Sequence, residues 1–146
     1  MQNSDNLTHS PHLDTVPTTS LTLGPRSARA VASLIARGLV RSAHDCSDGG
    51  LLVAIAEMLI GGDLGAEVDL AGVHADPVVA AFSETPSRYV LEVAEGDVAR
   101  VRAGLGEPPS VVIGKVTASK RLTWRGGGVD ESVEALAQAW LAPLDW

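Results

Sequence analysis

Two short polar segments contain the side chains of this sequence that could bind a ligand or carry out chemistry. The first is SAHDCSDGG at residues 42–50, and the second is FSETPSRY at residues 82–89. The first combines the carboxylates of Asp45 and Asp48 with a thiol and two glycines. The second combines hydroxyls, a carboxylate and a guanidinium. Groups of these types bind phosphates, sugars or divalent cations when a fold brings them together.

The glycine-rich end of the first segment could form an anion site. Ser47, Gly49 and Gly50 lie where a strand is expected to lead into a helix. The first backbone N–H groups of a helix have no partner inside the helix, and glycine lets an anion approach them closely. The structural alternative is that Ser47 or Asp48 caps the helix while the glycines relieve backbone strain. An acidic cap repels an anion, so the composition favours the structural interpretation.

The acidic residues of the first segment could also bind magnesium. Asp45 and Asp48, with His44 beside them, would offer oxygens to an ion that prefers carboxylates and water. Turn aspartates more often bond to their own backbone, and that interpretation is favoured here. Cys46 lies two residues from His44, but this spacing provides no third group to orient the pair. The sequence therefore predicts a small buried thiol without a catalytic role.

The second segment has two interpretations, and the sequence leaves both open. Ser83, Glu84 and Arg88, with the hydroxyl of Ser87, could hold a sugar or a phosphate. Equally, Glu84 and Arg88 could pair across the loop as an internal brace, with Pro86 fixing the loop's shape.

Hydrophobic periodicity predicts helices and strands around both segments. Gly38 and the Gly61-Gly62 pair are expected to end the first two helices. In the last helix, Asp130 is the expected cap and Trp140 an expected core residue. The element order indicates a mixed sheet covered by helices, in the α+β or α/β class. The predicted helices span about residues 25–38, 51–60, 75–82, 95–105 and 130–141, and the predicted strands 39–43, 64–70, 88–93, 110–116 and 121–125.

Composition limits the class of protein further. A chain of 146 residues with 45% hydrophobic content suits one domain with one packed core. The net charge of −7 argues against a nucleic-acid partner, because nucleic-acid affinity depends on clustered Lys and Arg. Residues 1–20 are mostly polar and are expected to form a flexible lead-in to a domain spanning residues 21–146.

The sequence also predicts a cytoplasmic location. Its polar amino terminus lacks the basic start and apolar stretch of a secretory signal, and its one cysteine cannot form an internal disulfide. The longest apolar run, residues 51–60, includes Glu57 and is about half as long as a bilayer requires. No membrane association is expected.

Two longer strings, LVRSAHDCSDGGLLVAIAEM and FSETPSRYVLEV, resemble the second-half carboxy-terminal domain of the phosphoribosylformylglycinamidine synthase family, also called formylglycinamide ribonucleotide amidotransferase. Order and spacing agree from about Leu21 to the closing SVEALAQAW. SAHDCSDGG alone is similar to a wider superfamily that includes aminoimidazole ribonucleotide synthetase, thiamine monophosphate kinase, selenophosphate synthetase and a hydrogenase maturation factor. The added SETPSRY narrows the resemblance to the synthase.

The resemblance implies an α+β fold in which a mixed sheet and helices form three layers, as in the carboxy-terminal domain of aminoimidazole ribonucleotide synthetase. It implies a purine-biosynthetic ligase that uses ATP and magnesium to convert formylglycinamide ribonucleotide to the amidine, with ammonia from glutamine. The expected partners are the enzyme's ATP-binding domains and its glutaminase subunit. Those domains have no counterpart in the sequence before Leu21, so the chain alone is expected to bind no cofactor and to be inactive.

The loop SETPSR at residues 83–88 departs from the SESQER-like substrate loop of the family's first-half domain. The resemblance therefore implies that this domain is a structural counterpart of a working copy, and Ser83, Glu84 and Arg88 remain candidates for ligand contact. Two alternatives stay open. One is a free-standing module that binds a phosphorylated metabolite, and the other is a fragment of a superfamily relative such as thiamine monophosphate kinase.

Overall fold

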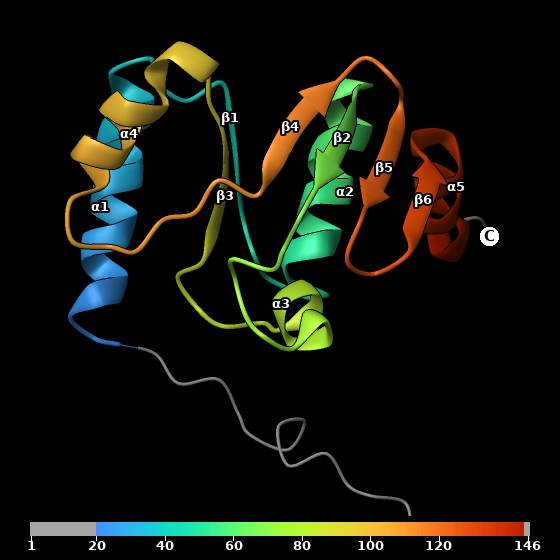
Figure 1. Ribbon diagram of the computed structural model, residues 1–146, viewed down its shortest axis with the longest axis horizontal. Helices are drawn as coiled ribbons and strands as arrows, with labels where there is room; N and C mark the ends of the chain where they lie inside the picture. Colours follow the sequence, from blue (N-terminus) through green and yellow to red (C-terminus); the bar gives the residue numbers. More distant parts are fainter. Residues whose placement is uncertain (1–19, 145–146) are drawn as a thin grey trace, which may run out of the picture.

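The computed structural model describes residues 20–144, so the predicted flexible lead-in lies, except for Ser20, outside the described residues. The described part is a mixed arrangement of helices and strands (Figure 1), and the predicted α+β class is confirmed. The helices are α1 (Leu23–Ala36), α2 (Gly50–Gly62), α3 (Pro77–Phe82), α4 (Val98–Leu105) and α5 (Val133–Leu141), with 3-10 turns at Glu95–Asp97 and Ala142–Leu144. The strands are β1 (Ser42–Asp45), β2 (Gly65–Val68), β3 (Tyr89–Glu92), β4 (Gly114–Thr117), β5 (Arg121–Trp124) and β6 (Val129–Ser132).

The strands form two sheets. Four of them make a mixed sheet in the order β4-β2-β5-β6, in which β2 and β5 are parallel and the other pairs antiparallel. The remaining two, β1 and β3, form an antiparallel pair. Figure 1 shows α2 behind the four-stranded sheet, and α1 with α4 at the opposite end of the molecule, beyond β1 and β3.

Two apolar clusters hold these layers together. The larger one packs one face of α2 against the four-stranded sheet, and Leu70 and Leu122 are each only 1% exposed within it. The smaller one lies between α1 and α4, where Leu34 is fully buried beside Leu39 and Val101. Both clusters consist mainly of small and branched side chains, as the composition predicts. Within residues 20–144, no helix is both long enough and apolar enough to span a membrane.

Strand β6 corrects the prediction for the last helix. Asp130 is not a helix cap, because it lies inside β6 opposite Thr123 and pairs with Arg121. The helix α5 begins later, where the Ser132 hydroxyl accepts a hydrogen bond from the Ala135 N–H at 3.1 Å. The sequence VDES has no apolar alternation, so only the partner strand β5 makes it a strand.

Trp140 was expected in the core, and that prediction is wrong. Its side chain lies in the last turns of α5 and the residue is 51% exposed. The indole N–H donates a hydrogen bond to Glu57 Oε1 on α2 at 3.1 Å. Among the α5 residues whose burial the structure describes, Val133 alone is buried, so α5 contacts the core at its start and leaves its end at the rim.

The first residue of α2 offers a direct test of packing in this fold. Gly50 has a φ of +72°, and a Cβ atom added to it would lie 2.6 Å from the Phe82 carbonyl carbon. We expect Gly50→Ala to lower the free energy of unfolding by about 2 kcal/mol or more, because both the left-handed backbone and the clash oppose a side chain. Urea denaturation measures this change.

Gly61→Ala, in the same helix, is the matched control. A Cβ atom at Gly61 would meet no heavy atom within 4 Å. Alanine should therefore leave stability unchanged or raise it by up to about 1 kcal/mol through helix propensity. Equal effects of the two substitutions would contradict the contact between α2 and α3.

Candidate functional site

The two polar segments meet at one end of the β1–β3 pair. Asp45 lies opposite Tyr89 in the strand register, and the Cys46 N–H donates to the Arg88 carbonyl at 2.9 Å. The strand β1 is therefore placed later than the predicted residues 39–43, because pairing with β3 sets its bounds. This register brings SAHDCSDGG beside FSETPSRY, as a shared site requires.

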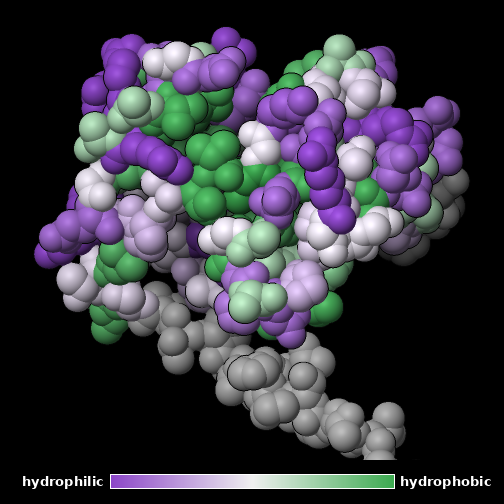
Figure 2. Space-filling view, viewed as in Figure 1, coloured by the Kyte–Doolittle hydropathy of each residue, from purple (hydrophilic) through white to green (hydrophobic). Residues whose placement is uncertain are grey.

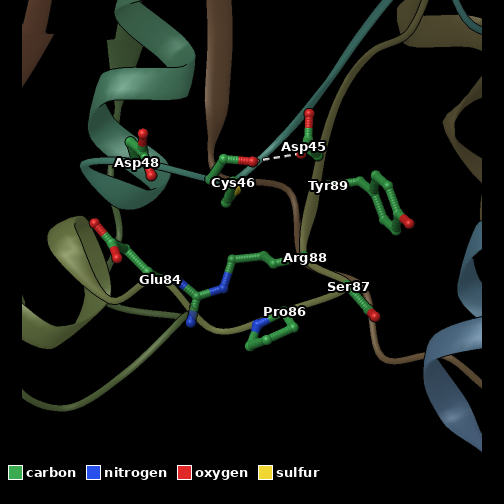
Figure 3. A pocket seen from close by; sticks show the side chains of 9 residues that line it. Asp45, Cys46, Asp48, Glu84, Pro86, Ser87, Arg88 and Tyr89 are labelled. Carbon is green, nitrogen blue, oxygen red and sulfur yellow. Dashed lines mark hydrogen bonds between the residues drawn. The ribbon is translucent and has the colours of Figure 1, made fainter. Parts of the chain in front are cut away.

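A pocket of about 340 Å³ lies between the two segments (Figure 3). Most of the predicted site residues line it, and three predicted residues, Gly49, Gly50 and Ser83, do not. Sequence analysis did not single out Tyr89 as a site residue, although it directly follows the predicted loop. The lining residues are Asp45, Cys46, Ser47, Asp48, Glu84, Pro86, Ser87, Arg88 and Tyr89.

The start of α2 already has an anion, which the protein itself supplies. The Gly49 N–H donates a hydrogen bond to Glu84 Oε1 at 2.9 Å, and Figure 3 shows this carboxylate directed toward the start of α2. Gly49 has a φ of +79°, the left-handed conformation that glycine adopts readily. Glu84 thus does from another loop what the glutamate of a capping box does from within a helix.

The predicted cap on α2 is wrong. The N-cap residue is Gly49, and neither the Ser47 nor the Asp48 side chain makes a cap hydrogen bond to the helix. The Ser47 hydroxyl instead donates to Asp45 Oδ2, the bond dashed in Figure 3. The reason is the tight left-handed turn at Gly49, which is followed by a second left-handed residue, Gly50.

The bond from Ser47 sets the ionisation of Asp45. It is the largest cause that lowers the pKa of the Asp45 carboxyl, and His44 adds a smaller electrostatic contribution. Between residues 20 and 144, no three His, Cys, Asp or Glu side chains are grouped so that they could hold a metal ion. The magnesium site proposed for Asp45 and Asp48 therefore stays a prediction, and these two residues would need further ligands.

Arg88 acts as a brace within the second segment. Its guanidinium Nη1 lies 3.5 Å from the carbonyl oxygen of Ala80 and 3.4 Å from that of Ser83, both at the end of α3. A cation suits the carbonyl end of a helix. The predicted pair between Glu84 and Arg88 is wrong, because no ion pair within 4.0 Å joins these two described residues. Each side chain braces a different helix end.

Cys46 is a buried thiol, as predicted. The residue is 5% exposed, and burial raises the pKa of its thiol, while the charge of Arg88 offsets part of that rise. A thiol with a raised pKa holds little of the nucleophilic thiolate at neutral pH. This supports its interpretation as a packing residue.

Sequence analysis missed Glu57 as a connecting residue. Its Oε2 lies 3.0 Å from His44 Nε2, and its Oε1 accepts the Trp140 N–H, so one carboxylate links β1, α2 and α5. The available signal was a single acidic residue within the apolar run 51–60. His44 is thereby held by α2 through Nε2, while its Nδ1 lies 3.8 Å from Asp45 Oδ1, and His44 does not line the pocket.

Comparison with known proteins identifies the family. A family model described as AIR synthase related protein, C-terminal domain, matches residues 2–126. The chain belongs to this family. The match includes both polar segments and every element from α1 to β5, so the resemblance inferred from the two strings is confirmed.

Relatives of this AIR synthase related domain are much longer proteins. The phosphoribosylformylglycinamidine synthase subunit PurL of Deinococcus radiodurans is 33% identical over 156 residues, covering 97% of this chain and 21% of the relative. The PurL subunit of Thermus thermophilus is 39% identical over 142 residues, covering 93% of this chain and 18% of the relative. The chain thus spans about a fifth of the length of these relatives.

A solved structure shares the fold. Thermotoga maritima PurL complexed with FGAR superposes with a TM-score of 0.72 at 22% identity, covering 84% of this chain and 22% of that protein. This likeness supports the α+β architecture of the AIR synthase related domain.

Removing the Glu84 carboxylate tests its role at the helix start. We expect Glu84→Ala to lower the free energy of unfolding by about 1 kcal/mol and to speed hydrogen exchange of the Gly49 amide, because that N–H loses its acceptor. NMR hydrogen exchange and urea denaturation measure the two effects. Glu84→Gln keeps an acceptor oxygen and should give smaller changes. Unchanged Gly49 exchange in Glu84→Ala would show that the bond is not made in solution.

A second test concerns the ionisation of Asp45. Ser47→Ala should raise the pKa of Asp45 toward its ordinary value, because the largest cause of its depression is removed. A depressed folded-state pKa stabilises the fold above the unfolded-state pKa, about 3.9, and this contribution is lost as pH falls through the folded-state value. Ser47→Ala should therefore weaken the dependence of stability on acid pH.

NMR titration of the Asp45 side chain gives the measurement for that test. Asp130 is the internal control, because the pKa of its carboxyl is lowered chiefly by the bond from Arg121. Its titration should be the same in both proteins. An Asp45 pKa that does not move in Ser47→Ala would show that another group depresses it.

Proposed function

We propose that this chain is the carboxy-terminal domain of a phosphoribosylformylglycinamidine synthase of purine biosynthesis. The whole enzyme would convert formylglycinamide ribonucleotide to the amidine in an ATP-dependent reaction. The match of the family model to residues 2–126, together with PurL relatives that cover almost the whole chain, supports this assignment. The relatives' additional length is where the remaining machinery of the reaction would lie.

The role of this domain in the enzyme would be structural, and one contact carries that proposal. The hydrogen bond from the Gly49 N–H to Glu84 joins the two polar segments. It occupies the N–H group at the start of α2 that a phosphate would otherwise bind. Arg88 is likewise directed to backbone carbonyls at the end of α3. The groups that could recognise a ligand thus hold the domain's own loops in place.

The described residues do not by themselves fit ATP and magnesium. The start of α2 faces the Glu84 carboxylate, and Asp45 and Asp48 could hold magnesium only together with water and the phosphate oxygens of a nucleotide. We therefore assign ATP and magnesium to the ATP-binding domains of the whole enzyme, and derive no step of the reaction through this chain. Thermotoga maritima PurL has been solved with ATP, which is consistent with nucleotide binding by a full-length relative.

The proposal also names partners and a location. The partners would be the ATP-binding domains, on the same or a separate chain, and a glutaminase subunit that supplies ammonia. The solved structure of PurLQS from Thermotoga maritima is consistent with a PurL assembly of several components. The enzyme would act in the cytoplasm, where purine nucleotides are made.

A free-standing module that binds a phosphorylated metabolite is the second candidate. The pocket of about 340 Å³, with Arg88 and Tyr89 in its lining, is the observation in its favour. The Glu84 carboxylate at the start of α2 opposes it, because a second anion there would be repelled. A kinase fragment of the thiamine monophosphate type has less support, since the relatives compared above are PurL subunits.

Complementation tests the proposed function. We would express the Thermus thermophilus PurL relative without its matching 142 residues, add this chain, and assay ATP- and ammonia-dependent amidine formation. Neither part alone should form amidine, and the mixture should. The double substitution Glu84→Ala, Gly50→Ala should reduce the activity of the mixture by weakening the joined loops, while Gly61→Ala should not. A mixture that neither associates nor forms amidine would contradict the proposal.

A further inference from the structure

Within residues 20–144, the outer edge of β4 pairs with no further strand and carries apolar side chains. β4 ends the order β4-β2-β5-β6, so among residues 20–144 it pairs with β2 only. Val111, Val112 and Val116, in β4 and the segment before it, are 46%, 56% and 45% exposed. A free strand edge presents N–H and C=O groups that can pair with another strand.

The strand register shows that this edge extends the buried face of the sheet. Val116 lies opposite Ala66, so the two side chains share one face of the sheet. Ala66 is 5% exposed, whereas Val116 is 45% exposed one strand further out. The Asp69 N–H also donates to the Ile113 carbonyl at 2.7 Å, so the extended backbone continues before the first residue of β4. Figure 2 shows hydrophobic surface over the middle of the molecule, between the α1–α4 end and the four-stranded sheet.

The opposite edge of the same sheet is protected in a way that β4 is not. β6 carries Asp130 and Glu131 within four residues, and charged side chains on an edge strand oppose pairing with another chain. The charged residue of β4 is Lys115, whose ammonium is paired with Glu67 at 3.3 Å. Residues 108–114, PPSVVIG, carry no charge at all. One edge therefore resists a new strand, and the other is suited to accept one.

We propose that a strand from the ATP-binding part of the enzyme adds to the outer edge of β4. This inference rests on the proposed function. About four fifths of each PurL relative lies outside the part that this chain matches, and the added strand would come from there. The strand would contribute backbone hydrogen bonds along β4 and apolar side chains against Val112 and Val116.

A second copy of this chain fits the edge less well. Each copy carries a net charge of −7, so two copies repel each other.

Hydrogen exchange in a chimera tests this inference. This chain would replace the matching 142 residues of the Thermus thermophilus PurL relative, and exchange of the amides of residues 111–117 would be compared with the chain alone. We expect exchange about tenfold or more slower in the chimera, because added backbone hydrogen bonds protect the edge. The β6 amides, residues 129–132, should exchange alike in both proteins. Val112→Lys with Val116→Lys should restore fast exchange of the edge, whereas Glu131→Lys on the opposite edge should not.

Each result bears on the inference separately from the proposed function. A chimera that forms amidine while residues 111–117 exchange as in the chain alone overturns the strand addition and leaves the proposed function standing. A chimera with a protected edge and no activity supports the strand addition and counts against the proposed function. If amide exchange of residues 111–117 in the chain alone slows as its concentration rises, a second copy covers the edge, and the inference is overturned. If the chimera does not fold, the same comparison is made on the chain mixed with the separately expressed remainder, and unchanged exchange there overturns the inference.

Discussion

The contact between the first turn of α2 and the end of α3 is the constraint on which the arrangement of this domain depends. A side chain at Gly50 would lie 2.6 Å from the Phe82 carbonyl carbon, so the two backbones touch and only glycine fits. The adjoining bond from the Gly49 N–H to Glu84 joins residues 35 positions apart in the sequence. Because this contact joins the two segments, β1 can pair with β3 while α2 packs on the four-stranded sheet.

This constraint explains why a cluster of reactive residue types serves as a brace. The start of α2 favours an anion, and Glu84 supplies one from within the domain. The carbonyl end of α3 favours a cation, and Arg88 supplies it. Ser47 and Asp45 satisfy each other in the turn between β1 and α2. Helix ends have the same electrostatic needs in a scaffold and in a binding site, so residue types alone do not distinguish the two.

The interior of the domain is well packed, whereas several large apolar side chains at its surface stay exposed. Leu34, Leu70 and Leu122 are almost entirely buried, and their surroundings contain elements from nearly the whole described chain. The valines near β4 and the indole of Trp140 are about half exposed. Under the proposed function, such surfaces would contact the other parts of the enzyme.

The sequence by itself determined the helices with strong apolar periodicity, the buried thiol of Cys46 and the family, because each depends on local spacing or on a literal string of residues. The tertiary structure decided the rest. β6 exists because β5 pairs with it, and Ser132 caps α5 because that strand displaces the helix start. Trp140 lies at the rim because α5 packs against the core through Val133 and Leu136, near its start. The partners of Glu84 and Arg88 depend on how α3 approaches α2, which is a contact between distant segments that local sequence patterns do not encode.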